Sequence, residues 1–190
     1  MRICIYGAAS NDIRESYITE TEKVGALLAQ HGHTLVFGGG ASGLMGAAAR
    51  GFHSKGAEII GVAPSFFNVD GVLFPHCTEM IYTETMRERK ETMENNADAF
   101  IVVPGGIGTF EEHFEILTSK QLCRHNKPIA LYNVKGYYDE LEAVMQQAMK
   151  KNFIRENCAD LYLLTDDLEA LFAYIEAPVK DHTVKELKDG

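Results

Sequence analysis

The feature that most constrains the fold of this chain is a regular alternation of short apolar segments with longer segments of helical period. The short segments have the length of a strand and are rich in β-branched residues. Strands that are apolar throughout and alternate with helices indicate parallel βαβ units, because such strands are covered on both faces. We therefore predict an α/β fold: a single domain with a doubly wound parallel sheet and helices on both faces.

Each expected element can be placed by residue number. The strands are predicted at Arg2–Tyr6, Thr34–Phe37, Glu58–Ala63, Ala99–Val103 and Pro128–Tyr132, with weaker ones at Met80–Tyr82 and Leu161–Leu164. The helices are predicted at Tyr17–His31, Gly43–Lys55, Thr85–Asn96, Thr109–Cys123, Gly136–Lys151 and Asp167–Ile175. Ligands of such sheets bind beyond the carboxyl ends of the strands, so functional residues are expected just after them.

Length and charge limit what the domain can do. The 190 residues allow one ordinary domain, predicted at 1–177, followed by a Lys- and Asp-rich segment at 178–190 that is predicted to be a flexible tail. A net charge of −9, from 27 acidic and 18 basic residues, argues against a nucleic-acid groove. No apolar segment approaches the ~20 residues of a membrane-spanning helix. We expect neither nucleic acid nor a membrane as a partner.

The cysteines indicate the compartment. Cys4, Cys77, Cys123 and Cys158 lie far apart, without a Cys-x-x-Cys pair and without a histidine at metal-ligand spacing nearby. That pattern predicts no metal site and is typical of proteins in a reducing compartment. The N-terminal apolar segment is too short for the core of a signal peptide. We therefore expect a cytoplasmic protein.

Two glycine-rich turns follow two of the predicted strands. The first is Gly38–Gly46 and the second is Pro104–Thr109. Glycines let a ligand approach the backbone closely, and the N–H groups of the helix that follows face an anion. Any tight turn can use glycine, but two such turns after two strands favour phosphate binding. Neither turn is a Walker loop or a dinucleotide fingerprint, so a nicotinamide cofactor is a poor fit.

A carboxylate lies just after the second turn. Thr109 and Glu112 fit a capping box, with Thr109 as the N-cap of a helix. In a functional interpretation, Glu112 faces the site. Cleavage of an N-glycosidic bond needs a carboxylate there, to stabilise positive charge on the ribose or to deprotonate the attacking water. The two interpretations are compatible, because one carboxylate can accept a cap hydrogen bond and still face a ligand.

A group of cations begins another predicted helix. Thr85 and Glu88 fit a second capping box, which puts Arg87, Arg89 and Lys90 into the first turns of that helix. Cations are unfavourable at a helix N-terminus, and a nearby anion such as a nucleotide phosphate removes that penalty. The alternative is a solvated basic patch paired with neighbouring acidic residues.

These motifs resemble those of the LOG (Lonely Guy) family. The segment Pro104-Gly105-Gly106-Ile107-Gly108-Thr109-Phe110-Glu111-Glu112 matches the family's Pro-Gly-Gly-x-Gly-Thr-x-x-Glu at every fixed position. Gly38–Gly40 with Gly43–Gly46 matches its earlier glycine turn, and Met86 with Arg89-Lys90 matches its Met-x-x-Arg-Lys element. Weaker likenesses at 60–64, 127–129 and 133–138 extend the resemblance over most of the chain.

The resemblance implies a modified Rossmann fold and a homodimer with active sites near the subunit interface. It also implies cofactor-free hydrolysis of cytokinin riboside 5′-monophosphates, often with activity on AMP, to free base and ribose 5-phosphate. The catalytic residues that it carries over are Arg89 and Glu112. The substrate-binding residues that it suggests are Ser10, Gly39, Gly40, Met86, Lys90, Gly105, Gly106, Ile107, Gly108, Thr109, Phe110, Glu111 and Thr118.

Some positions depart from the family pattern. The family usually has Asp and His where this chain has Thr85 and Arg87, and a Cys-Gly-Ser-Ser turn where this chain has Gly7-Ala8-Ala9-Ser10. A substrate-contacting Glu usually falls near Gly71, where the nearest carboxylate is Asp70. These departures affect contacts to the base and the ribose, while the phosphate cradle and the catalytic pair are intact.

Other functions are possible on the same fold. A nucleotide sensor, or a carrier of a larger phosphorylated cofactor like the molybdenum-cofactor carriers, shares the glycine turns but has no need of an Arg89–Glu112 pair. A purely structural role is disfavoured because the glycine turns lower stability. The label lysine decarboxylase, often given to this family, has no support here, since no residue is marked as the Schiff-base lysine that pyridoxal phosphate requires.

Overall fold

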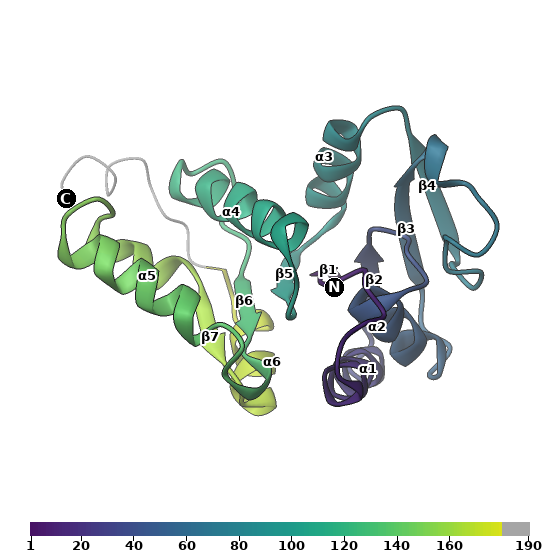
Figure 1. Cartoon of the computed structure of the whole chain (residues 1–190), viewed down its shortest axis with the longest axis horizontal. Coiled ribbons are helices and arrows are strands. Elements are labelled where there is room, and N and C mark those ends of the chain that lie inside the picture. The colour runs from purple at the N-terminus through teal and green to yellow at the C-terminus, as the bar shows by residue number, and fades with distance from the viewer. Residues whose placement is uncertain (180–190) are drawn as a thin grey trace.

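The computed structural model describes residues 1–179 and contains a seven-stranded sheet flanked by helices (Figure 1). All paired strands are parallel. The strands are β1 (Arg2–Tyr6), β2 (Thr34–Phe37), β3 (Ile59–Pro64), β4 (Glu79–Thr83), β5 (Ala99–Val102), β6 (Ile129–Tyr132) and β7 (Leu163–Thr165). The α/β prediction is confirmed, and both weaker strands are present as β4 and β7.

The helices cover the sheet on both faces. They are α1 (Glu15–Gln30), α2 (Gly43–His53), α3 (Met86–Asn96), α4 (Ile107–Gln121), α5 (Asp139–Lys150) and α6 (Leu168–Ile175), with short 3-10 turns η1 (Ser65–Phe67), η2 (Val134–Gly136) and η3 (Glu156–Leu161). The helix predicted from Gly136 begins only at Asp139, because Lys135 and Gly136 have φ of 56° and 72° and form a turn instead. None of the helices within residues 1–179 has the length and apolarity that a membrane crossing requires.

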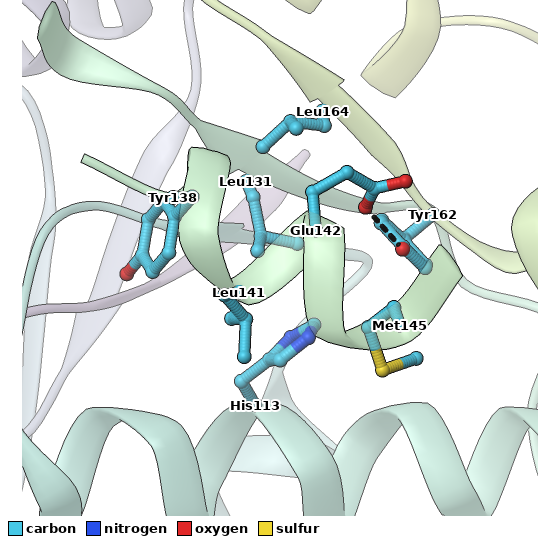
Figure 2. Close-up of a pocket in the computed structure, with 8 residues that line it drawn as sticks. All are labelled: His113, Leu131, Tyr138, Leu141, Glu142, Met145, Tyr162 and Leu164. Carbon is cyan, nitrogen blue, oxygen red and sulfur yellow. Dashed lines mark hydrogen bonds between the residues drawn. The ribbon is translucent and has the colours of Figure 1, made fainter. Parts of the chain in front are cut away.

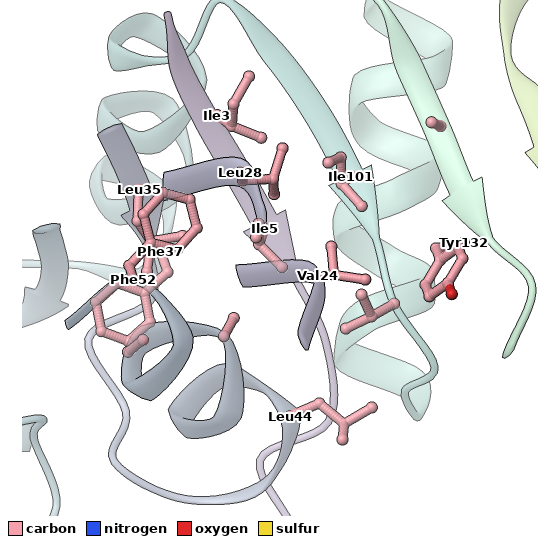
Figure 3. Packing of buried hydrophobic residues seen from close by; sticks show 14 of the residues in the cluster. Ile3, Ile5, Val24, Leu28, Leu35, Phe37, Leu44, Phe52, Ile101 and Tyr132 are labelled. Carbon is pink, nitrogen blue, oxygen red and sulfur yellow. The ribbon is translucent and has the colours of Figure 1, made fainter. Parts of the chain in front are cut away.

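Two hydrophobic layers hold the helices on the sheet. On one face, Ile3 and Ile5 of β1 pack with residues of α1 and α2, as Figure 3 shows. Residues of α6 belong to the same layer. On the other face, Cys4 and Tyr6 pack with residues of α3, α4 and α5. Successive side chains of a strand point to opposite faces, so a strand that is apolar throughout serves both layers. Burial on both faces of the sheet therefore explains why these strands are apolar throughout.

The order of the strands positions the site. The sheet runs β4-β3-β2-β1-β5-β6-β7, so β1 lies at the centre, with β2 on one side and β5 on the other. The chain fills the sheet outward in one direction from β1 and then in the other from β5. A crevice for ligands forms beyond the carboxyl ends of the strands where this reversal occurs. Residues 180–190, which include most of the predicted tail, lie outside the described residues.

Candidate active site

A large cavity lies at the strand-order reversal. Its volume is about 630 Å³, which is in the range of small-molecule sites. Its walls come from the segments that follow β1, β2, β3 and β5, and from the first turns of α3 and α4. The lining residues are Gly7, Ala8, Ala9, Ser10, Gly38, Gly40, Ser42, Met45, Phe67, Gly71, Val72, Leu73, Met86, Arg89, Gly106, Gly108, Thr109 and Glu112.

A buried ion pair forms the charged centre of this cavity. Arg89 Nη1 donates a hydrogen bond of 2.9 Å to Glu112 Oε1, and the two residues are 6% and 8% exposed. Arg89 Nε also donates to the carbonyl oxygen of Val62 at 3.2 Å, so the guanidinium is held from two sides. A Cβ on Gly38 would lie 1.9 Å from Arg89 Nη2, so only glycine leaves room for the guanidinium there. The structure thus joins the two residues expected to be catalytic.

The environment of Glu112 changes its acidity. Burial raises the pKa of the Glu112 carboxyl, and the charge and hydrogen bond of Arg89 oppose this effect without cancelling it. The net pKa lies above the usual value of 4.5. A carboxyl whose pKa is shifted toward neutrality inside a cavity is suited to proton transfer or to stabilising a cation.

The start of α4 leaves backbone N–H groups without partners in the part of the chain that the structure describes. Gly106 is the N-cap of this helix and has no side-chain cap, and the first turn carries no acidic residue. The backbone N–H groups of Ile107, Gly108 and Thr109 have no partner among the hydrogen bonds of residues 1–179. Unpaired N–H groups at a helix N-terminus bind phosphate well.

The capping box predicted at Thr109 and Glu112 is wrong. The helix begins two residues before Thr109, which lies buried in the first turn, and the carboxylate of Glu112 bonds to Arg89 rather than to the backbone. A helix can begin at a glycine, without a side-chain cap, when a ligand accepts hydrogen bonds from its first N–H groups. A capping box is then not needed. Of the capping box predicted at Thr85, the first hydrogen bond forms: Thr85 Oγ1 accepts from Glu88 N at 3.1 Å. Glu88 reaches back to Glu84 N.

The other glycine turn offers fewer donors. The N–H of Gly43 donates to Asn11 Oδ1 at 2.9 Å, and the N–H groups of Leu44 and Met45 donate to the carbonyl oxygen of Ala8. The chain itself therefore occupies the first donors of α2. The expectation of two phosphate-facing helix starts reduces to one, at α4, because Asn11 and Ala8 cap α2.

Lys90 bridges two helices beside the cavity. Its ammonium forms ion pairs with Glu111 and, at 2.9 Å, with Glu115. Burial alone lowers the pKa of Lys90, but hydrogen bonds and charges from the two glutamates outweigh it and leave the pKa raised. Lys90 therefore stays charged and links α3 to α4, which keeps Arg89 and Glu112 in register.

The remaining predicted site residues divide into two groups. Ser10, Gly40, Met86, Gly106, Gly108 and Thr109 line the cavity. Gly39, Lys90, Gly105, Ile107, Phe110, Glu111 and Thr118 do not line it. Ile107, Glu111 and Thr118 lie on an exposed stripe of α4, and Thr118 is the farthest of them from the turn. Thr118 therefore has no place in the lining of this cavity.

Sequence reasoning missed two supports of the second glycine turn. Tyr137 donates a hydrogen bond of 2.6 Å to the carbonyl oxygen of Gly105, and Tyr138 donates one of 2.7 Å to that of Val103. The adjacent tyrosines are visible in the sequence, but their partners are more than 30 residues away, at separations of 32 and 35. No local pattern reports such a contact.

Sequence reasoning also missed the apolar wall of the cavity. Phe67, Val72 and Leu73 line it from the segment that follows β3. Phe67 and Val72 are exposed apolar side chains at 40% each. A run of apolar residues outside any strand or helix was the available signal for a binding loop.

A buried histidine, His113, directly follows Glu112 in α4. His113 does not line the cavity and points toward Leu141, Met145 and Tyr162, as Figure 2 shows. The space there is about 10 Å³, enough for about one water molecule and no substrate. Burial lowers the pKa of His113 to about 4, so the ring is neutral at physiological pH. This region packs α4 onto α5 and is not a second active site.

Comparison with known proteins shows the family of the chain. A family described as "Possible lysine decarboxylase" matches residues 45–175. A cytokinin riboside 5′-monophosphate phosphoribohydrolase of Arabidopsis thaliana is 33% identical over 181 residues, covering 95% of this chain and 85% of that protein. A rice protein of the same name, from Oryza sativa subsp. japonica, is 35% identical over 183 residues, covering 96% and 76%.

Solved structures show the same fold at lower identity. The molybdenum cofactor carrier protein of Chlamydomonas reinhardtii has a TM-score of 0.70 at 23% identity, covering 100% of this chain and 98% of that one. The molybdenum cofactor binding protein of Rippkaea orientalis has a TM-score of 0.64 at 19% identity, covering 92% and 93%. These likenesses concern the fold alone. The sequence relatives and the matching residues identify the chain as a member of the LOG family, whose named members are cytokinin riboside 5′-monophosphate phosphoribohydrolases.

Proposed function

We propose that this protein is a hydrolase that cleaves the N-glycosidic bond of nucleoside 5′-monophosphates and releases free base and ribose 5-phosphate. The observation that carries the proposal is the buried Arg89–Glu112 pair, which lies in a nucleotide-sized cavity beside the uncapped start of α4. A protein that only stores or senses a nucleotide has no need to bury a carboxylate beside its ligand, since burial of charge is costly.

The phosphate of the nucleotide binds at the first turn of α4. The N–H groups of Ile107, Gly108 and Thr109 donate to it, and the helix dipole favours its charge. The ribose then lies near Glu112, which lines the same cavity. Phosphate binding in this way fixes C1′ relative to the carboxylate without any metal ion or cofactor.

The chemical step breaks the bond between C1′ and the base nitrogen. Positive charge develops on the ribose, and the Glu112 carboxylate stabilises it and accepts a proton from the attacking water. The water oxygen bonds to C1′, and the base leaves with the bonding electron pair and takes up a proton. Arg89 orients the Glu112 carboxylate through its 2.9 Å hydrogen bond and donates to the ligand with its remaining N–H groups.

The cavity also suits an apolar base substituent. The apolar side chains of Met45, Phe67, Val72, Leu73 and Met86 line it. Apolar surface favours a prenylated adenine over adenine by about 0.8 kcal/mol for each methylene that is buried. We therefore propose cytokinin riboside 5′-monophosphate as the preferred substrate, with AMP as a poorer one, in keeping with the names of the relatives.

The site contradicts the activity in the name of the matching family. The described lining of the cavity contains no lysine, so no Schiff base with pyridoxal phosphate can form there. Lys90 lies beside the cavity but is paired with Glu111 and Glu115, and its raised pKa makes it a poor nucleophile. Lysine decarboxylation therefore has no candidate residue in this cavity.

We also propose a cytoplasmic homodimer whose catalytic unit is residues 1–177. The four cysteines are all free, as expected in a reducing compartment. The exposed stripe of α4 carries Ile107 and Phe114, and exposed Leu122 follows as the C-cap of the helix; Ile107 is 87% exposed. Apolar side chains aligned along one helix face are suited to contact with a second copy, which also brings Thr118 toward a neighbouring cavity.

The test is an assay of base release with AMP and with isopentenyladenosine 5′-monophosphate. We expect wild-type protein to release both bases, the prenylated one faster, and Glu112→Gln to lose at least ~100-fold in kcat while still binding nucleotide. Glu91→Gln, an exposed change on α3, is the matched control and keeps full turnover.

Two results would contradict the proposal. Full turnover by Glu112→Gln would remove the catalytic role of the carboxylate. Binding of nucleotide by the wild type without any base release would indicate a sensor or carrier instead, and would direct attention to the departures at Thr85, Arg87 and Gly71.

A further inference from the structure

Three potential metal ligands meet beyond the amino ends of the strands, on the opposite side of the sheet's length from the cavity. His31 Nδ1 and His33 Nε2 each lie 2.9 Å from the same oxygen, Oε1 of Glu176. The three ligand atoms are all within 4.8 Å of one another. His33 directly precedes β2, whereas the glycine turn of the cavity directly follows it, so the cluster and the cavity lie at opposite ends of that strand.

The backbone aims the two histidines at one point. His31 is the C-cap of α1, and Gly32 has φ of 78° in the left-handed region, where nothing approaches within 4 Å of its position for Cβ. The N–H groups of Gly32 and His33 bond back to Ala29 and Leu28, which closes the end of the helix. A side chain on each side of this turn therefore faces the same space.

The cluster is rigid on one side and open on the other. The His33 side chain is 5% exposed, whereas His31 and Glu176 are 43% and 38% exposed, so solvent reaches the ligand atoms. The His31 ring stacks on Phe172 at 4.5 Å, which fixes its orientation. His33 Nδ1 is buried without a hydrogen-bond partner in the described chain, so Nε2 alone makes the polar contact of this ring.

The electrostatics at this point favour a cation. His31 caps the C-terminus of α1 and Glu176 that of α6, and neither helix has a basic residue in its last turn. Helix C-termini carry partial negative charge, which a Lys or Arg commonly compensates. Two such ends converge here beside the Glu176 carboxylate.

We propose that His31, His33 and Glu176 bind a divalent ion of the zinc class, with a water molecule as the fourth ligand. Two imidazoles and one carboxylate are a donor set for such ions. Ligand atoms around a tetrahedral zinc are about 3.3 Å apart, so each 2.9 Å contact opens by only about 0.4 Å to admit the ion. The ion fastens the end of α6 to the junction of α1 and β2.

The expectation of no metal site was based on the cysteines and on histidines near them. His31 and His33 are not near a cysteine in the sequence, so that reasoning did not include them. The His-Gly-His spacing is visible in the sequence, but the third ligand is 143 residues beyond His33. The inference is independent of the catalytic proposal, because the cluster lies at the other end of the strands and its test does not use turnover.

The test titrates untagged, metal-free protein with Co²⁺ and then with Zn²⁺. We expect one ion per chain, a Co²⁺ visible spectrum of nitrogen and oxygen ligands without a thiolate charge-transfer band, and a higher Tm with Zn²⁺. His31→Ala and Glu176→Gln change exposed residues, so they keep the fold. Each should weaken binding by at least about tenfold, the smallest usual effect of losing even a supporting partner of a ligand.

The control is His53→Ala, which alters another exposed histidine pair. The rings of His53 and His76 stack at 4.3 Å without a carboxylate in the group, so this change should leave affinity and the Tm increase unaltered. Wild-type affinity in both His31→Ala and Glu176→Gln would overturn the proposal, as would failure of the wild type to bind either ion. The cluster is then only a hydrogen-bonded ion pair.

Discussion

At the scale of single residues, Glu112 is governed by two opposing effects. Burial raises the pKa of its carboxyl, and the Arg89 guanidinium lowers it by a smaller amount. Burial therefore outweighs the arginine in setting the pKa of Glu112. A carboxyl group dominated by its arginine would have a depressed pKa instead. Gly38, in the first glycine turn, supports this arrangement because its missing side chain leaves space for the Arg89 guanidinium.

A pH profile tests this tuning. If the ionised form of Glu112 is active, turnover is lost as pH falls through its pKa, and the raised pKa places this acid limb above 4.5. Arg89→Gln removes the opposing charge, so we expect lower activity and a limb at still higher pH. The measurement is kcat/KM against pH, with circular dichroism at each pH to exclude unfolding. A limb at or below 4.5 in the wild type, or a downward shift in Arg89→Gln, would refute the argument.

At the scale of elements, the connection between β5 and α4 carries the site. Gly106 begins the helix without a side-chain cap, and this leaves N–H groups for a ligand. Hydroxyl groups of Tyr137 and Tyr138 hold the preceding carbonyls of Gly105 and Val103. The segment that follows β6 thus fixes the turn through two hydrogen bonds.

Tyr138→Phe measures this support. The change leaves a buried carbonyl of Val103 without its 2.7 Å partner, which lowers the free energy of unfolding by about 1–3 kcal/mol. We expect a lower Tm and a raised KM, because the phosphate-binding turn loses its anchor. Tyr82→Phe, an exposed change on β4, is the matched control. Equal values for both variants in calorimetry and kinetics would mean that the hydroxyl of Tyr138 does not position the turn.

At the scale of the whole molecule, the two halves of the sheet bring the site together. The segments that follow β1 and β2 come from the first half of the order, and the turn after β5 comes from the second. Arg89 and Glu112 lie on α3 and α4, which stand on the same face of the sheet in Figure 1. The stripe of α4 that faces away from this core is the surface available to a second copy.

The dimer prediction concerns this stripe. We expect the wild-type protein to sediment with twice the mass of one chain, because exposed Phe114 and its neighbours on α4 are covered by the partner. Phe114→Glu places a charge in that contact and should shift the protein toward monomer. Val144→Glu, which alters an exposed apolar residue of α5, should leave the mass unchanged. A monomeric wild type, or equal effects of the two changes, would exclude this interface.

The sequence by itself determined the elements and their layers. Residues that are apolar without interruption, as in β1 and β2, have to be buried on both faces, and this dictates a parallel sheet between helices. The bounds of both strands agree with the prediction. The glycine turns and Glu112 also stood out in the sequence, because glycines and a carboxylate just after strands suit phosphate binding and glycosidic chemistry. Arg89 was singled out by its match to the Met-x-x-Arg-Lys element of the family.

Only the tertiary structure decided which groups meet. Thr109 has the pattern of an N-cap, yet Gly106 begins the helix, since a donor left for a ligand leaves no mark in a local pattern. Asn11 caps a helix 32 residues away, and Glu176 joins histidines more than 140 residues away. Helix and strand formation depend on neighbours in the chain and can be read from periodicity. Contacts between distant segments depend on how the layers pack, so they become visible only in the folded molecule.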